Sequence, residues 1–136
     1  MEFERAILSE RDAAAYSPLA LAHIGDAVYE LFARTRVTAH GGGKVGALHR
    51  ETVKYVAAPA QAAAFRRIEP QLTDAELTMF KRGRNANGHP APNSSTSAEY
   101  HAATGLETLF GWLYLTGQTA RAGELFELGN EMAVNN

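Results

Sequence analysis

Apolar residues recur at helical spacing along most of this chain, and no segment alternates apolar and polar residues in the manner of a β-strand. Alanine, the residue with the highest helix propensity, occurs 25 times among the 136 residues. We also find no β-hairpin signal between the apolar segments. Pattern and propensity agree, and the sequence therefore predicts an all-α fold.

Residues that begin or end helices set the expected boundaries. Ser17 followed by Pro18 is typical of an N-cap and a first helical position, and this helix should run to about Thr38, before three consecutive glycines. Thr73, followed three residues later by a glutamate, fits a capping box. Further helices are expected near residues 45–56, 59–68, 73–84, 98–116 and 118–134.

Length and composition favour one globular domain. A chain of 136 residues can bury a substantial core but is too short for two ordinary domains, so we expect residues 1–136 to form a single one. The content of 46% hydrophobic and 21% charged residues is typical of a globular protein, and no apolar run is long enough to span a membrane. The charged N-terminal residues do not resemble a secretory signal, so we expect a cytoplasmic protein.

The residue types restrict which metal and nucleic-acid chemistry is available. Without cysteine there is no thiolate zinc site, and the five histidines lack the i, i+4 pairing of a zinc-binding helix. Any metal should therefore have oxygen ligands. The formal net charge of −2 excludes nucleic-acid binding through bulk charge but permits binding through a local basic patch.

Asp26 lies in a narrow polar stripe of the first long helix, together with His23, Glu30 and Arg34. The opposite face of this helix is apolar and contains Leu21, Ile24, Val28 and Leu31. We expect a central helix that is covered over most of its circumference and whose acids open toward a cleft. The alternative is a solvated ladder of i, i+4 contacts, which contributes only a few tenths of a kcal/mol.

Glu107 is the one acidic residue between Tyr100 and Thr116, and this stretch contains no lysine or arginine. A buried carboxylate needs a partner, which must come from elsewhere in the fold. If Glu107 faces Asp26, the two acids repel each other unless a cation lies between them, and oxygen ligands suit Mg²⁺ or Mn²⁺. The alternative is a structural glutamate bonded to a helix terminus or an arginine.

A basic segment ends the fourth of these helices: Lys81, Arg82 and Arg84, followed by Asn85. Cations and short polar donors suit a phosphate backbone, although basic residues also favour helix C-termini because they complement the dipole. The next thirteen residues, 85–97, form a long polar loop, which is either functional or a disordered surface excursion. The polar side chains after Asn85 in this loop include Asn87, His89, Asn93, Ser94 and Ser95.

Three segments together resemble the ribonuclease III family. The segment LALAHIGDAVYELFAR, residues 19–34, is similar to the family's signature helix, and Asp26 stands where that helix has its metal-binding aspartate. The segment YHAATGLETLFGWLYL, residues 100–115, resembles the second catalytic helix, with Glu107 at the place of its glutamate. KRGRNA, residues 81–86, lies between them, so the likeness covers nearly the whole chain and is closest to bacterial members consisting of the nuclease domain alone.

This resemblance implies an all-α homodimer that cleaves both strands of double-stranded RNA with Mg²⁺ or Mn²⁺, typically during maturation of precursor 23S ribosomal RNA. It assigns the catalytic and metal-binding roles to Asp26 and Glu107. It also implies a single catalytic domain with no double-stranded RNA-binding domain. RNA affinity would then come from the basic segment and the polar loop.

The sequence departs from the classical family pattern at two positions. That pattern has a glutamate four residues before the signature aspartate and an aspartate three residues before the second glutamate, and this chain has Ala22 and Thr104 there. Asp26 and Glu107 would hold the metal with water or substrate phosphate, and with Glu30 as a further candidate. Two alternatives follow: a non-catalytic double-stranded RNA-binding or ribosome-assembly module, and a helical adaptor whose acids are structural.

Overall fold

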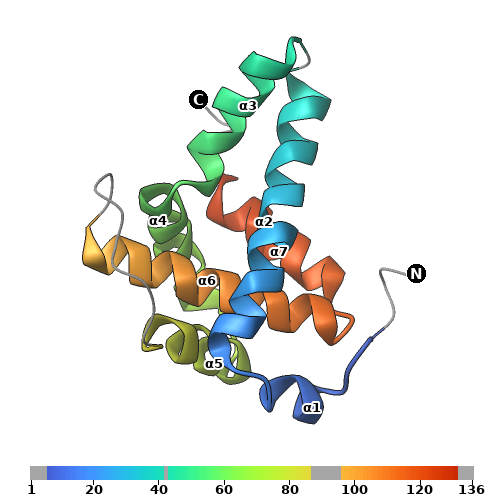
Figure 1. Cartoon of the computed structure of the whole chain (residues 1–136), viewed down its shortest axis with the longest axis vertical. Coiled ribbons are helices and arrows are strands. Elements are labelled where there is room, and N and C mark those ends of the chain that lie inside the picture. Colours follow the sequence, from blue (N-terminus) through green and yellow to red (C-terminus); the bar gives the residue numbers. More distant parts are fainter. Residues whose placement is uncertain (1–5, 42, 87–95, 132–136) are drawn as a thin grey trace.

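The computed structural model describes residues 6–41, 43–86 and 96–131, and within these residues every regular element is a helix (Figure 1). The prediction of an all-α fold is therefore confirmed. The elements are α1 (Glu10–Ala14), α2 (Pro18–His40), α3 (Val45–Val56), α4 (Ala58–Ile68), the 3-10 helix η1 (Glu69–Gln71), α5 (Asp74–Arg84), α6 (Ser97–Leu115) and α7 (Thr119–Gly129).

The capping residues act as the sequence predicts. The Ser17 hydroxyl accepts a hydrogen bond from the Ala20 amide at 3.1 Å, and Pro18 is the first residue of α2. Thr73 and Glu76 form a complete capping box at α5, with bonds of 2.9 and 3.1 Å. The bounds of α2 to α6 lie within two residues of those expected. The last helix was expected to run from 118 to 134, but α7 ends at Gly129 with Asn130 as its C-cap, so the predicted end was too late. Residues 132–136 lie outside those that the structure describes.

Two short elements were not predicted, α1 and η1. The α1 helix has five residues and is capped by Ser9, whose hydroxyl accepts a hydrogen bond from the Asp12 amide at 3.0 Å. Such a helix is too short to show apolar periodicity, so only its cap could have revealed it.

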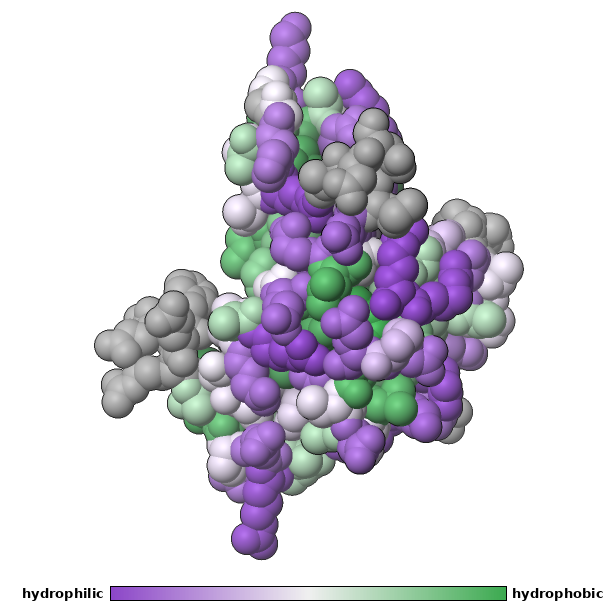
Figure 2. Space-filling model, turned by 180° about the vertical axis from the view of Figure 1, so that it is seen from behind, coloured by the Kyte–Doolittle hydropathy of each residue, from purple (hydrophilic) through white to green (hydrophobic). Residues whose placement is uncertain are grey.

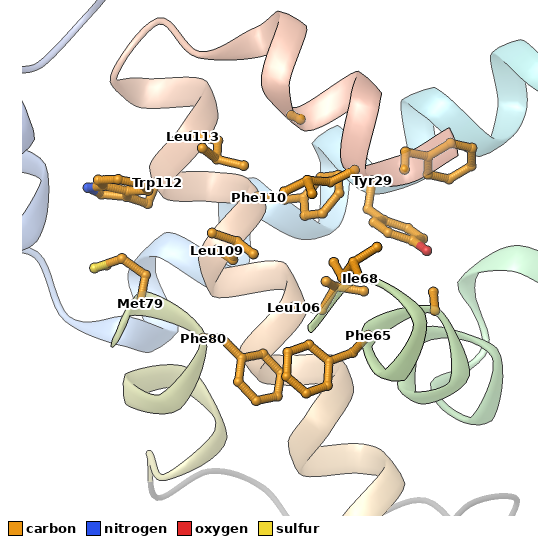
Figure 3. Close-up of a cluster of buried hydrophobic side chains, with 14 of the residues drawn as sticks. Tyr29, Phe65, Ile68, Met79, Phe80, Leu106, Leu109, Phe110, Trp112 and Leu113 are labelled. Carbon is orange, nitrogen blue, oxygen red and sulfur yellow. The ribbon is translucent and has the colours of Figure 1, made fainter. Parts of the chain in front are cut away.

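The central element is α6, which packs against α2, α4, α5 and α7. Four of its large apolar side chains are fully buried: Leu106, Leu109, Phe110 and Leu113. Figure 3 shows them among side chains from the surrounding helices, including the stacked rings of Phe65 and Phe80, whose centroids lie 3.6 Å apart. Each large apolar side chain buried in this way contributes roughly 1.5–3 kcal/mol of transfer free energy. The core therefore fixes the position of α6.

The main chains of α2 and α6 touch where the two helices cross. A Cβ added to Gly25 would lie 1.6 Å from the Glu107 carbonyl oxygen, and one added to Gly111 would lie 1.9 Å from the Leu21 carbonyl oxygen. Only glycine leaves room for such an approach. The crossing brings Asp26, the neighbour of Gly25, beside the backbone position of Glu107.

The face of α2 opposite the polar stripe is only partly covered, which corrects one expectation. Leu21 is 1% exposed, but Leu31 is 59% exposed, and Ile24 and Val28 are half-buried. The reason is that α6 packs on the side of α2 that carries Gly25, which lies away from Leu31 on the helix circumference. A strip of apolar surface therefore remains on α2.

One side of the molecule has a mainly polar surface. Figure 2 shows hydrophilic side chains over most of one side of the molecule, with smaller hydrophobic areas between them. Across the described ranges, each helix is too short or too polar to cross a membrane.

Candidate active site

Asp26 and Glu107 line the same pocket, although their helices are far apart in the sequence. The pocket has a volume of about 380 Å³ and is formed by α2, the N-terminal half of α6 and Ala86, which follows α5 closely. The contact of Gly25 with the Glu107 main chain explains why the two acids meet. The cleft expected from the sequence is therefore present at this crossing.

The carboxyl group of Glu107 has a strongly altered proton affinity. Burial raises its pKa to about 8, and the negative charge of Asp26 and a hydrogen bond with Asp26 act in the same direction. A hydrogen bond from Gln61 opposes these effects, with its Nε2 atom 3.3 Å from Glu107 Oε2. When both carboxyl groups are ionised they repel each other, and a cation between them would stabilise the ionised pair.

Asp26 occupies the exposed side of the pocket. It also borders a second hollow, of about 520 Å³, together with His23, Glu30 and Arg34. Glu30 forms an ion pair with Arg34, which is one of the i, i+4 contacts expected for a solvated face. Glu30 is thus beside Asp26 but does not line the pocket that contains Glu107.

Ala22 and Thr104, the two departures from the classical pattern, both line the pocket. The Thr104 hydroxyl donates a hydrogen bond to the Tyr100 carbonyl at 3.1 Å, and its oxygen can still accept. Among the described residues, no group of three histidine, aspartate or glutamate side chains is placed to hold one metal ion. The acidic donors available in the pocket are two carboxylates.

This donor set fits a hard divalent cation. Carboxylate oxygens suit Mg²⁺ and Mn²⁺, and Mg²⁺ is commonly bound through one or two carboxylates with water and substrate phosphate as the remaining ligands. Burial and the neighbouring charge of Asp26 both raise the pKa of Glu107, because both make its ionised form costly. A cation between the two carboxylates would offset this cost.

The basic segment leads directly to the pocket, because Ala86, the residue after Asn85, forms part of the pocket wall. Lys81, Arg84 and Asn85 are exposed. The Arg84 guanidinium lies 5.8 Å from the centre of the Phe80 ring, and its Nε atom donates to Asn85 Oδ1 at 3.1 Å. These side chains are available to a ligand at the end of α5. The predicted loop residues 87–95 lie outside those that the structure describes.

Arg82 differs from its neighbours, because its guanidinium contacts this chain's own backbone. It donates hydrogen bonds to the Ala14 carbonyl at 2.9 Å and to the Tyr16 carbonyl at 3.0 Å. These bonds join α5 to the connection between α1 and α2. Arg82 therefore has a structural role, beside the RNA-binding role predicted from the sequence.

Two residues near the acids, Gln61 and His101, were not predicted from the sequence. Gln61 of α4 bonds to Glu107, while Tyr100 and His101 of α6 line the pocket. A lone polar residue in the alanine-rich segment 57–65 is the signal that could have identified Gln61. Tyr100 lies two helical turns before Glu107, and this spacing places it on the same side of the helix as Glu107. His101 is offset from Glu107 by about 120° around the helix, so spacing alone gives no signal for it.

Comparison with known proteins yields one family and several similar chains. The ribonuclease III domain family matches residues 19–118. Mini-ribonuclease 3 of Symbiobacterium thermophilum is 49% identical over 110 residues, which cover 81% of this chain and 85% of that protein. Mini-ribonuclease 3 of a Thermoanaerobacter species is 43% identical over 122 residues, covering 90% of this chain and 86% of the relative.

A solved structure has the same architecture. The X-ray crystal structure of a protein from Fusobacterium nucleatum superposes with a TM-score of 0.74 at 29% sequence identity. The match covers 91% of this chain and 97% of the other. The two folds thus agree over nearly their whole length.

Proposed function

This chain belongs to the ribonuclease III family of double-stranded RNA endoribonucleases, in its Mini-ribonuclease 3 group, and we propose that Asp26 and Glu107 are its metal-binding catalytic residues. One observation carries this proposal: the two carboxylates line one pocket at the crossing of α2 and α6. Residues 1–136 would form a single catalytic domain around this crossing.

The two acids have different tasks in this proposal. Bound Mg²⁺, or Mn²⁺ in its place, would supply the Lewis acid that offsets charge developing on the scissile phosphate. Glu107, partly buried and held by Gln61, provides the fixed ligand. Asp26, which is exposed, provides the ligand on the side where RNA enters. Ionisation of Glu107 is required before it can bind a cation, and its raised pKa makes this step dependent on pH.

Lys81, Arg84 and Asn85 would contact the RNA backbone. They are exposed in or directly after the last turn of α5, which leads to Ala86 of the pocket wall, so they can hold phosphates of an RNA that enters the pocket. Arg82 would support this surface by fixing the end of α5 through its bonds to Ala14 and Tyr16.

The protein would act as a homodimer through the apolar strip of α2. A shallow hollow of about 310 Å³ is lined there by Ile24, Val28, Leu31 and Phe32, among others. The hollow is almost entirely apolar, and Leu31, one of its lining residues, is 59% exposed. A second copy related by a two-fold axis would cover both strips at once and present two catalytic pockets to the two RNA strands.

The dimer can be tested by sedimentation. Leu31→Lys places a charge in the apolar strip and should yield monomers with little duplex cleavage. Val45→Lys is the matched control, because Val45 is 81% exposed on α3, away from this strip. A Leu31→Lys protein that remains dimeric would exclude this surface.

The proposed activity is tested by incubating the protein with a defined RNA duplex and sizing the products. Cleavage of both strands with Mg²⁺, and none with a chelator, is expected. Binding without cleavage under both conditions would contradict the proposal. We further propose that the physiological substrate is the precursor of 23S ribosomal RNA. Correct trimming of duplexes formed by its two ends, in preference to an unrelated duplex, would support this assignment.

A further inference from the structure

Gln61 is a buried polar residue directly behind the two acids. It lies in α4 and is 2% exposed. Its Nε2 atom donates to the Val56 carbonyl at 2.9 Å and to Glu107 Oε2 at 3.3 Å. Its Oε1 atom is buried without a hydrogen-bond partner among the described residues.

The orientation of the Gln61 amide follows from these partners. Both the Val56 carbonyl and the Glu107 carboxylate are acceptors, so the amino end of the amide must face them. Rotating the amide would place its oxygen against two other oxygens. The side chain donates through both hydrogens of Nε2, while its buried oxygen has no partner. The two donated hydrogen bonds are therefore the interactions that this side chain makes.

Val56 gives Gln61 a fixed anchor. It is the last residue of α3, and the carbonyls in the last turn of a helix have no partner within that helix. The bond from Gln61 therefore satisfies the end of α3 and directs the second Nε2 hydrogen toward α6. Three helices, α3, α4 and α6, thus meet at one amide group.

We propose that Gln61 is a positioning residue that holds Glu107 as a metal ligand. This inference rests on the proposed metal-binding role of Glu107. A donor on Oε2 fixes the plane of the carboxylate and leaves the other oxygen for the cation. Partners of this kind behind a metal ligand typically change metal affinity by about 10–100-fold when they are removed.

The decisive variant is Gln61→Met, which keeps the length of the side chain and removes both donors. Binding of Mn²⁺ without RNA, followed by electron paramagnetic resonance, should weaken by about 10–100-fold. The Mg²⁺ concentration for half-maximal duplex cleavage should rise in parallel, and cleavage should recover at high Mg²⁺. A residue that served only to end α3 would leave both quantities unchanged.

Thr52→Val is the matched control. Thr52 is buried on the neighbouring α3 and donates to the Leu48 carbonyl at 2.9 Å, away from the pocket. This variant should lose stability while its Mn²⁺ affinity stays that of the wild type. An equal loss of Mn²⁺ affinity in both variants would assign the effect to general destabilisation and overturn the proposal.

A measurement on the wild-type protein covers the case in which Gln61→Met does not fold. Addition of Mg²⁺ should shift the side-chain amide resonance of Gln61 and leave that of Gln118, which bonds to the Thr116 hydroxyl, in place. An unshifted Gln61 resonance, or a folded Gln61→Met protein with wild-type Mn²⁺ affinity, overturns this inference alone. Wild-type protein that neither binds Mn²⁺ nor cuts duplex RNA overturns the proposed function and the inference together.

Discussion

Gly25 of α2 lies against the main chain of Glu107 in α6, so closely that a Cβ on Gly25 would come within 1.6 Å of the Glu107 carbonyl oxygen. Gly25, which permits the helix crossing, is thus next to Asp26 in the sequence and in contact with the main chain of Glu107. The geometry of the pocket depends on backbone packing, and the first prediction tests this dependence.

Gly25→Ala should destabilise the protein by about 3 kcal/mol or more, because the added methyl overlaps backbone atoms that cannot move aside. Chemical denaturation measures the loss. Gly46→Ala is the control: its Cβ would lie 3.5 Å from the Arg50 side chain, which is ordinary contact, and alanine is the better helix former. Equal stability of the two variants would contradict the close crossing.

Asp26→Asn should remain folded and lose duplex cleavage by at least about 100-fold, since loss of a direct ligand should cost no less than loss of a partner behind it. Asp26 is exposed, so its replacement leaves the core intact. Cleavage assays and circular dichroism provide the measurements. Glu30→Gln, which alters the neighbouring ion pair with Arg34, should retain most of the activity. Undiminished turnover by Asp26→Asn would exclude its catalytic role.

The raised pKa of Glu107 predicts how the stability of the metal-free protein depends on pH. The pKa is about 8 in the folded state and near 4.5 in the absence of the fold, so between these values the folded protein binds a proton that the unfolded chain has lost. Stability should therefore fall as the pH rises from about 4.5 to 8 and then level off. Urea unfolding in the presence of a chelator measures this slope.

Two comparisons belong to the same experiment. Glu107→Gln cannot ionise, so its unfolding free energy should vary less over this pH range. Excess Mg²⁺ should stabilise the wild type most at the alkaline end, where Glu107 is ionised. If Glu107→Gln had the pH slope of the wild type, a group other than Glu107 would cause the pH dependence of stability.

Lys81→Ala and Arg84→Ala should weaken RNA binding without loss of stability, and each should reduce the slope of log affinity against log salt by about 1. Arg82→Ala should behave differently. It leaves two backbone carbonyls, those of Ala14 and Tyr16, without their charged donor, and should lower stability by roughly 1–3 kcal/mol. Binding titrations over a range of salt concentrations separate the two effects. If the salt slope changed in Arg82→Ala and not in Lys81→Ala or Arg84→Ala, Arg82 would be the RNA contact and the roles assigned to Lys81 and Arg84 would be wrong.

The sequence predicted the helices well, because their signals are local. Capping residues and apolar spacing placed α3 at residues 45–56, as in the structure, and α2, α4, α5 and α6 within two residues, whereas α7 ends earlier than predicted. The five-residue α1 was missed because it has too few turns for a period to appear. Asp26 and Glu107 were identified from their placement in apolar helices, and the structure places both in one pocket.

The remaining features depend on packing between helices, which a single sequence does not specify. The largest aliphatic residues of α2 suggested a covered face, yet the crossing at Gly25 leaves Leu31 exposed. Gln61 has no local pattern that connects it to Glu107, since the bond joins two helices. Arg82 is one of three cations in a row, and only the position of Ala14 and Tyr16 distinguishes it from the other two.

The contact between Gly25 and Glu107 also limits how substrate can enter. Any motion that widened the pocket by separating α2 from α6 would have to pull apart two touching main chains at the centre of the core. The backbone that carries the two acids is thus held in place, and the approach of a wide duplex must be accommodated by side chains and segments outside the crossing. The crossing of α2 and α6 therefore sets the spacing of the two acids, whereas other parts of the molecule would adapt to the shape of the RNA.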